Sequence, residues 1–240
     1  MAEGYHQLGI QVFDDANNLE TPINNQEFLV IDYDDAATSI EITEFQDSDI
    51  FSYKSDFTIN NLDDNVSSLV LNNAKHPYNN ATTYTVALKK PLTISEDNKD
   101  FRYEDFAIVE PYTDDLTDLT QFYDYVLIEA STDLITWKTL DKYDARRFPE
   151  WLAEFNKGTD AVGSDALFKE QNIVLTDKGF EIGDTVVFKF SLVSDPGASS
   201  YGWAIQSINK NTATASVADV LACNQVFAIY PTVSKGNFTV

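Results

Sequence analysis

Short apolar segments with a period of two residues constrain the fold of this chain more than any other feature. Within residues 181–205, the side chains of Val186, Phe188, Phe190 and Leu192 recur at every second position. This period places them on one face of a β-strand, and glycine, aspartate and proline on either side predict turns at both of its ends. The segment is therefore expected to be a half-buried strand.

Comparable segments follow one another along most of the chain. The predicted strands centre on residues 40–42, 66–71, 84–88, 101–109, 125–130, 137–140, 173–175, 186–193 and 203–208. One short helix is expected over residues 149–155, with a proline near its first turn. Many short strands with almost no helix favour an all-β fold. We predict an antiparallel β-sandwich of jelly-roll type over residues 33–210.

The first 32 residues predict a separate β-hairpin. His6, Leu8 and Ile10 alternate with other residues, a polar turn follows, and Phe28 begins an apolar return strand. The pair resembles the last two strands of an immunoglobulin-like module. Two interpretations stay open: residues 1–32 are the tail of a preceding module, or a strand pair docked on the next one.

The charge balance restricts the partners. Lys and Arg number 16 and Asp and Glu 39, which gives a net charge of −23. Such a charge repels phosphate backbones and anionic membranes, so we expect no nucleic acid and no membrane insertion, whereas carboxylates attract divalent cations. The single cysteine, Cys223, precludes an intramolecular disulfide. Met1-Ala2-Glu3 does not have the basic, then apolar, character of a signal peptide.

The last residues resemble a known export signal. Residues 211–226 read as a linker of mostly small residues, and residues 227–240, FAIYPTVSKGNFTV, then resemble the start of the C-terminal sorting domain of type IX secretion. Tyr230-Pro231 and the stretch 234–238 match that family, while Thr232-Val233 replaces its usual Asn-Pro. The resemblance implies a secreted or cell-surface protein, the type IX machinery as a partner, and a sorting domain cut short at residue 240.

A second resemblance covers residues 76–208. Its motifs, in order, include FRYEDFAIVEP (101–111), YDYVLIEASTD (123–133), EIGDTVVFKFSLVSDP (181–196) and YGWAIQSI (201–208). They are similar to a jelly-roll module of type IX cargo proteins that is related to MAM-like and cleaved-adhesin modules. The resemblance implies a non-catalytic binding or adhesion role. Gln206-Ser207 stands where this family usually has Asp-Asn, which puts any metal role of that aspartate in doubt.

A break in the alternation suggests a metal site. Phe101 and Tyr103 share one phase and Phe106 and Ile108 the other, so we expect a β-bulge near Glu104-Asp105. The bulge would bring four carboxylates together at one rim as oxygen ligands for a structural Ca²⁺, an ion that related jelly rolls often carry. The candidate ligands are Glu104, Asp105, Glu110 and Asp124. The alternative is a solvated acidic surface.

The loop 143–151 is the candidate ligand surface. Tyr143, Arg146, Arg147 and Trp151 combine aromatic rings with guanidinium groups, a composition that suits stacking on a sugar or binding a carboxylate. In the alternative interpretation, which we favour, the arginines pair with nearby acids and Trp151 caps the sandwich.

The sequence offers little for catalysis. His6 and His76 are far apart and neither begins a zinc motif, Cys223 lies in the linker, and no nucleophile or phosphate-loop motif occurs. A carboxylate pair for glycoside hydrolysis stays open, but we nominate no catalytic residue. The expected function is binding of a glycan or surface protein. The alternative is an accessory domain of a secreted protease or polysaccharide-degrading enzyme whose catalytic domain lies before residue 1.

Overall fold

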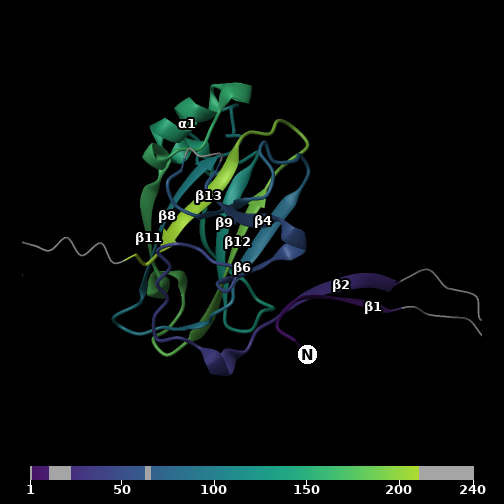
Figure 1. The fold of residues 1–240 in the computed structure, drawn as a ribbon, viewed down its shortest axis with the longest axis vertical. Coiled ribbons are helices and arrows are strands. Elements are labelled where there is room, and N and C mark those ends of the chain that lie inside the picture. Colours follow the sequence, from purple (N-terminus) through teal and green to yellow (C-terminus); the bar gives the residue numbers. More distant parts are fainter. Residues whose placement is uncertain (1, 11–22, 63–65, 211–240) are drawn as a thin grey trace, which may run out of the picture. The chain divides into compact units, whose positions relative to one another are not determined.

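Two antiparallel sheets face each other in the computed structural model, which describes residues 2–10, 23–62 and 66–210 (Figure 1). In these residues one sheet has six strands: β3 (Ile50–Ser52), β6 (Thr83–Leu88), β7 (Leu92–Thr93), β9 (Tyr125–Ser131), β10 (Lys138–Tyr143) and β12 (Thr185–Val193). The other has five in the same ranges: β4 (Phe57–Asn60), β5 (Val70–Asn73), β8 (Asp100–Ile108), β11 (Lys169–Val174) and β13 (Gly202–Ile208). The fold is an all-β sandwich of jelly-roll type, as predicted.

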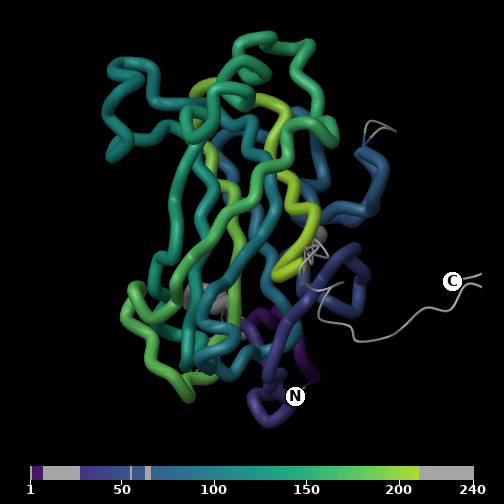
Figure 2. Tube along the Cα trace, turned by 90° about the vertical axis from the view of Figure 1, so that its left-hand side faces the viewer, coloured from purple at the N-terminus to yellow at the C-terminus, as the bar shows by residue number. Residues whose placement is uncertain are grey.

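Within each sheet, strands that are distant in sequence lie side by side. The first sheet runs β10-β9-β12-β6-β3, with β7 beside β12, and the second runs β11-β8-β13-β5-β4. Consecutive strands such as β8 and β9, or β12 and β13, lie in different sheets, so the chain crosses repeatedly between the layers (Figure 2).

The core lies between the sheets. Phe188 of β12 stacks on Phe101 of β8 with ring centroids 4.1 Å apart, and Phe190 contacts Trp203 of β13 at 6.0 Å. All four rings are fully buried. Burial of such side chains stabilises the fold by roughly 1.5–3 kcal/mol each, which explains why the period-two pattern decides the architecture.

A helical segment covers part of the five-stranded sheet. The helix α1 (Pro149–Phe155) has the predicted bounds, and its proline occupies the first turn, where no backbone hydrogen bond is lost. Trp151 is its buried anchor. Short 3₁₀ turns in the described part of the chain are η1 (Tyr33–Asp35), η2 (Tyr53–Ser55), η3 (Ala145–Arg147), η4 (Gly158–Asp160), η5 (Asp165–Leu167) and η6 (Leu175–Lys178).

The predicted N-terminal hairpin is present as β1 (Gly4–Ile10) and β2 (Ile23–Val30), paired antiparallel. The described residues, up to Lys210, belong to one compact unit. Tyr5 of the hairpin meets Tyr53 edge to face at 5.2 Å, and the Asp32 amide donates to Glu3. The predicted linker, 211–226, and sorting segment, 227–240, lie outside the described residues.

Candidate functional site

Three carboxylates from three separate segments meet at one end of the sandwich. Glu110 follows β8, Asp124 precedes β9 and Asp195 follows β12. The register of β9 and β12 explains why two of them meet, because Tyr125 pairs with Val193, which brings Asp124 opposite Ser194, the residue before Asp195. The Asp195 amide donates to Asp124 Oδ1 at 2.7 Å, and the Asp124 amide to the Glu110 carbonyl at 3.2 Å.

Further hydrogen bonds hold this acidic cluster, which we define as Glu110, Asp124 and Asp195. The Tyr78 hydroxyl donates to Asp124 Oδ2 and accepts from the Glu110 amide at 3.0 Å. The Ala198 amide donates to Glu110 Oε2 at 3.0 Å. Backbone and phenol groups therefore orient each carboxylate.

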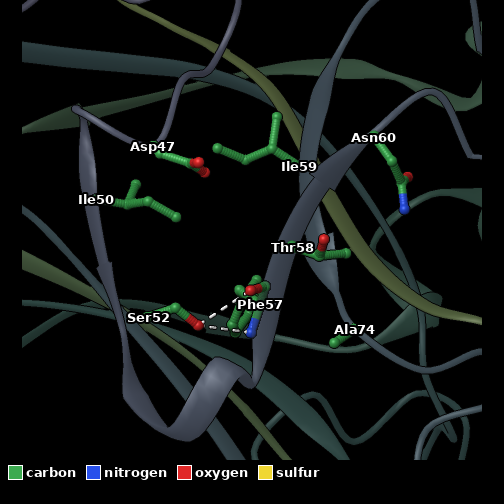
Figure 3. Close-up of a pocket in the computed structure, with 8 residues that line it drawn as sticks. All are labelled: Asp47, Ile50, Ser52, Phe57, Thr58, Ile59, Asn60 and Ala74. Carbon is green, nitrogen blue, oxygen red and sulfur yellow. Dashed lines mark hydrogen bonds between the residues drawn. The ribbon is translucent and has the colours of Figure 1, made fainter.

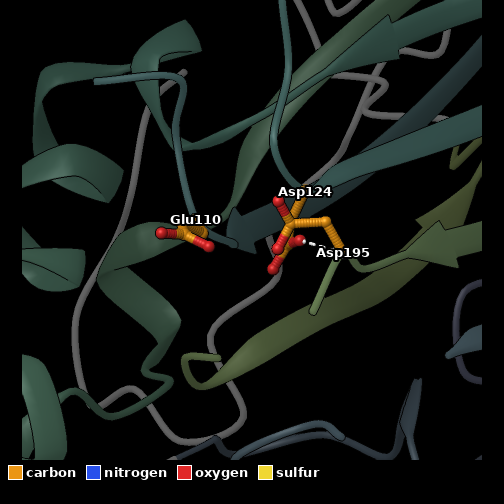
Figure 4. Close-up of side chains that lie close together, drawn as sticks. All are labelled: Glu110, Asp124 and Asp195. Carbon is orange, nitrogen blue, oxygen red and sulfur yellow. Dashed lines mark hydrogen bonds between the residues drawn. The ribbon is translucent and has the colours of Figure 1, made fainter. Parts of the chain in front are cut away.

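One carboxylate oxygen from each of the three residues lies within 4.8 Å of the other two (Figure 4). Burial raises the pKa of Asp124 to about 7, with Glu110 and Asp195 adding repulsion, and burial also raises the pKa of Glu110. Carboxylate oxygens have two lone pairs each, so those that accept a hydrogen bond can still coordinate a cation. The donor set fits a hard divalent cation, for which oxygen ligands are preferred.

The four predicted calcium ligands do not all meet at one place. The structure brings Glu110 and Asp124 together but separates them from Glu104 and Asp105. Glu104 accepts from Ser207 Oγ at 2.8 Å and lies 3.8 Å from Lys210 Nζ. Asp105 is completely buried in the core.

The direction in which the side chains of β8 point explains why Asp105 lies in the core and not at the rim. Asp105 continues the inward series of Phe101 and Tyr103, so the strand does not switch faces at this point. Phe106 points to the opposite face and is nevertheless buried, because Phe168 covers it with ring centroids 4.9 Å apart. A register shift does occur opposite Glu104-Asp105, but the extra residue, Gln206, belongs to β13.

Asp105 is the centre of a hydrogen-bond network between the sheets. Its carboxylate accepts from Trp203 Nε1 at 2.8 Å, from Gln171 Nε2 at 3.2 Å and from the Tyr143 hydroxyl. Burial nevertheless dominates and raises the pKa of Asp105 to about 7. These contacts join β8, β10, β11 and β13, so the residue acts in the core and not at a rim.

The candidate ligand surface is also largely internal. Tyr143 and Trp151 are buried, and the Trp151 indole donates to the Leu167 carbonyl at 2.7 Å. These rings do not present an open face to a sugar. Both contribute instead to the packing of the 143–168 segment on the five-stranded sheet.

The two arginines of this loop pair with acids, as the alternative interpretation holds. Arg146, whose side chain is only 2% exposed, lies 2.6 Å from Asp144, and it donates to three carbonyls of the 115–121 loop. Arg147 lies 2.7 Å from Asp141 and is the more exposed of the two. Arg146 therefore anchors a neighbouring loop.

The histidines have structural contacts. His76 Nδ1 lies 2.7 Å from the Tyr201 carbonyl, and His6 stacks on Phe28 with ring centroids 5.6 Å apart. Cys223 lies outside the described residues.

Asp195 is the residue that sequence reasoning missed. Its Asp-Pro-Gly motif predicts a turn, and the Gly197 amide does donate to the Asp195 carboxylate at 2.5 Å. The useful signal is positional, since this turn ends a strand that pairs with the strand beginning after Asp124.

Comparisons with known proteins add little. No family model matches the sequence, and no curated protein matches it. Among solved structures, the glycoside hydrolase domain of Endo-D from Streptococcus pneumoniae R6 is similar over 66% of this chain, with 11% identity and a TM-score of 0.38. This chain covers 20% of that one, so it spans about a fifth of its length. A similarity at this level carries no argument about activity. In the described part of the chain, no helix has the length and apolar character needed to cross a membrane.

Proposed function

We propose that this chain is a non-catalytic binding module of an exported protein, and that a calcium ion at the acidic cluster stabilises it. The observation that carries the proposal is the approach of Glu110, Asp124 and Asp195 to within 4.8 Å. Three carboxylates at this separation repel one another, and burial adds a cost for Asp124. A divalent cation would offset both effects.

The ion would fix three points on two connections. Glu110 begins the 109–124 connection, Asp124 ends it, and Asp195 begins the connection from β12 to β13. Loops that a rigid sandwich holds in place are a common location for ligand recognition. We propose that the partner is a glycan or a surface protein.

Export through type IX secretion is part of the same proposal. Its support is the resemblance of residues 227–240 to a sorting domain, and of residues 76–208 to a module of type IX cargo proteins. The second candidate is an accessory domain of a secreted protease or polysaccharide-degrading enzyme. The coding sequence before residue 1 separates the two, since adhesin repeats favour the first and a catalytic domain the second.

A glycan array and a binding assay on intact cells test the binding function. We expect the chain to bind one class of glycan or cell surface in millimolar Ca²⁺ and to lose at least about tenfold in affinity, about 1.4 kcal/mol, in EDTA. Glu110→Gln should lose the calcium effect, whereas Asp97→Asn, an exposed aspartate outside the acidic cluster, should keep it. Absence of binding to every glycan and surface would contradict the proposal. So would polysaccharide hydrolysis that Asp195→Asn abolishes.

A further inference from the structure

Two consecutive strands diverge into different sheets and leave a cleft between them. β3 is the last strand of the six-stranded sheet and β4 the last strand of the five-stranded sheet, and only η2 connects them. Between them lies a cleft of about 730 Å³ (Figure 3). Asp47, Ile50, Ser52, Phe57 and Ile59 are among the residues that line it. The cleft thus lies along the open side of the sandwich.

The pairing pattern shows where the backbone groups of β3 point. The Lys89 amide donates to the Asp49 carbonyl at 2.9 Å, one residue beyond the Ile50–Leu88 pair on each strand. In an antiparallel ladder this arrangement makes Ile50–Leu88 a non-hydrogen-bonded pair. The N–H and C=O of Ile50 therefore point away from β6, toward the open edge.

The same reasoning applies to β4. The Ala74 amide donates to the Asp56 carbonyl at 2.8 Å, so Phe57–Asn73 is a non-hydrogen-bonded pair, and alternation puts Ile59–Leu71 in the same class. The N–H and C=O of Phe57 and Ile59 point away from β5. Each of the two strands thus presents backbone donors and acceptors on the side that faces the cleft.

At one end of the cleft, a side chain already makes the hydrogen bonds that a neighbouring strand would make. Ser52 Oγ accepts from the Phe57 amide at 2.9 Å and donates to the Phe57 carbonyl at 3.0 Å (Figure 3). The serine hydroxyl thus satisfies both outward groups of Phe57, as a paired residue of a neighbouring strand would. Ile59, two residues further along, presents the same pair of groups beyond the reach of this serine.

The side chains that line the cleft indicate what kind of ligand it could bind. Ile50 and Phe57 are buried and Ile59 is half-buried, so the floor of the cleft is apolar. Asp47, which is exposed, adds a carboxylate to the lining. In a chain of net charge −23, this lining is complementary to an apolar segment with a cationic residue.

We propose that the cleft binds an extended peptide segment of a partner protein by strand addition. The peptide backbone bonds to the outward groups of Ile59 and Ile50, an apolar side chain packs among Ile50, Phe57 and Ile59, and a Lys or Arg faces Asp47. Main-chain bonds supply the affinity in this mode and the alternate side chains supply the specificity. This inference goes beyond the proposed function, because it assigns a second partner to a site that none of the acidic cluster residues lines.

Peptide titration tests the inference on the complete chain. The probe is the fluorescein-labelled pentapeptide Lys-Val-Thr-Val-Thr, with Glu-Val-Thr-Val-Thr as its control, measured by anisotropy. We expect saturable binding of the lysine peptide below about 1 mM, at least about tenfold tighter than that of the glutamate peptide. The Ile50 and Ile59 amides should exchange hydrogen more slowly in the complex. Absence of binding would overturn the proposal.

Two substitutions locate the site. Ile59→Pro removes one N–H that points to the cleft and leaves the β4–β5 ladder intact, so binding should weaken by about tenfold or more. Ile59→Val keeps the N–H and should bind within about threefold of the unsubstituted chain. Equal binding by both variants would overturn the proposal.

A charge reversal keeps the test decisive if the proline variant does not fold. Asp47→Lys should make the glutamate peptide the better ligand, whereas Asp97→Lys, the same change outside the cleft lining, should not. An unchanged preference in Asp47→Lys would overturn the proposal. So would a dimer of this chain that protects the same amides, because it would assign the cleft to a second copy.

The peptide-binding test and the calcium test can fail independently of each other. Glu110→Gln should leave peptide binding unchanged, since Glu110 is not among the residues that line the cleft. Loss of peptide binding with an intact calcium effect would remove only the strand-docking inference. Loss of the calcium effect with intact peptide binding would remove only the metal site.

Discussion

Asp105 illustrates how a single buried carboxylate can join two sheets. It accepts hydrogen bonds from Tyr143, Gln171 and Trp203, which belong to three different strands. Burial raises its pKa to about 7 from an ordinary 3.8. The folded protein therefore binds a proton more tightly at this position than the unfolded chain does.

This difference predicts an unusual pH dependence. A carboxyl with a raised pKa in the folded state contributes stability that is fully present below about pH 4 and is lost as the pH rises through about 7. Relative to Asp105→Asn, the unsubstituted protein should therefore lose roughly 2–4 kcal/mol of unfolding free energy between pH 5 and pH 8. Urea denaturation in EDTA at both pH values measures the difference.

Two controls bracket the result. Asp97→Asn, at an exposed position outside this hydrogen-bond network, is the matched control. Asp105→Leu leaves three donors without an acceptor and should cost about 3 kcal/mol or more at every pH. If the Asp105→Asn difference is the same at pH 5 and pH 8, the raised pKa is wrong.

At the scale of the elements, the contact between β5 and β13 depends on a glycine. Gly202 begins β13 with a φ of +124°, and an added Cβ would lie 2.1 Å from Asn73 Oδ1. That oxygen accepts from the Trp203 amide at 2.7 Å, so it is held in place. A larger residue at position 202 would therefore meet both backbone strain, from the positive φ, and steric overlap with Asn73.

Gly202→Ala is expected to lower the free energy of unfolding by roughly 2–4 kcal/mol, because both the backbone and Asn73 must shift. Gly158→Ala is the matched control, since its φ is +64° and nothing lies within 4 Å of an added Cβ. It should lose only about 1–2 kcal/mol, the cost of the backbone conformation alone. Urea denaturation compares the two, and equal losses would show that the overlap with Asn73 contributes nothing.

Local patterns predicted the elements with regular apolar spacing or a clear start signal, although β12, expected to be half-buried, is buried on both faces. β12 and α1 follow from apolar spacing and from a proline in the first turn. β3 and β4 were not predicted, because each pairs on one side only and has few apolar residues. The strand predicted around residues 40–42 is reduced to a single bridge between Ile42 and Ile208.

The acidic cluster was only partly predictable for a related reason: two of its three residues were among the predicted ligands. Glu110 and Asp124 lie close to strand ends, where loops meet. Asp105 was assigned to the rim because Phe106 is apolar and out of phase, but Phe168 covers that face from more than 60 residues away. Such coverage depends on tertiary packing, which alternation within one strand does not encode.

The molecule as a whole is a β-sandwich with two separate candidate binding features. The acidic cluster joins two connections at one end, and the cleft lies between the edge strands β3 and β4. The cluster carries the proposed function, since a bound ion would couple loop positions to the stability of the whole β-sandwich.

Thermal unfolding of the chain in Ca²⁺ and in EDTA tests this claim most directly. A ligand that binds only the folded state stabilises it by about 2.7 kcal/mol at 100 times its Kd, which corresponds to a rise in Tm of roughly 5–10 °C for a domain of this size. We predict that rise for the unsubstituted chain and for Asp97→Asn, and its loss in Glu110→Gln. An identical Tm in Ca²⁺ and in EDTA would contradict the account.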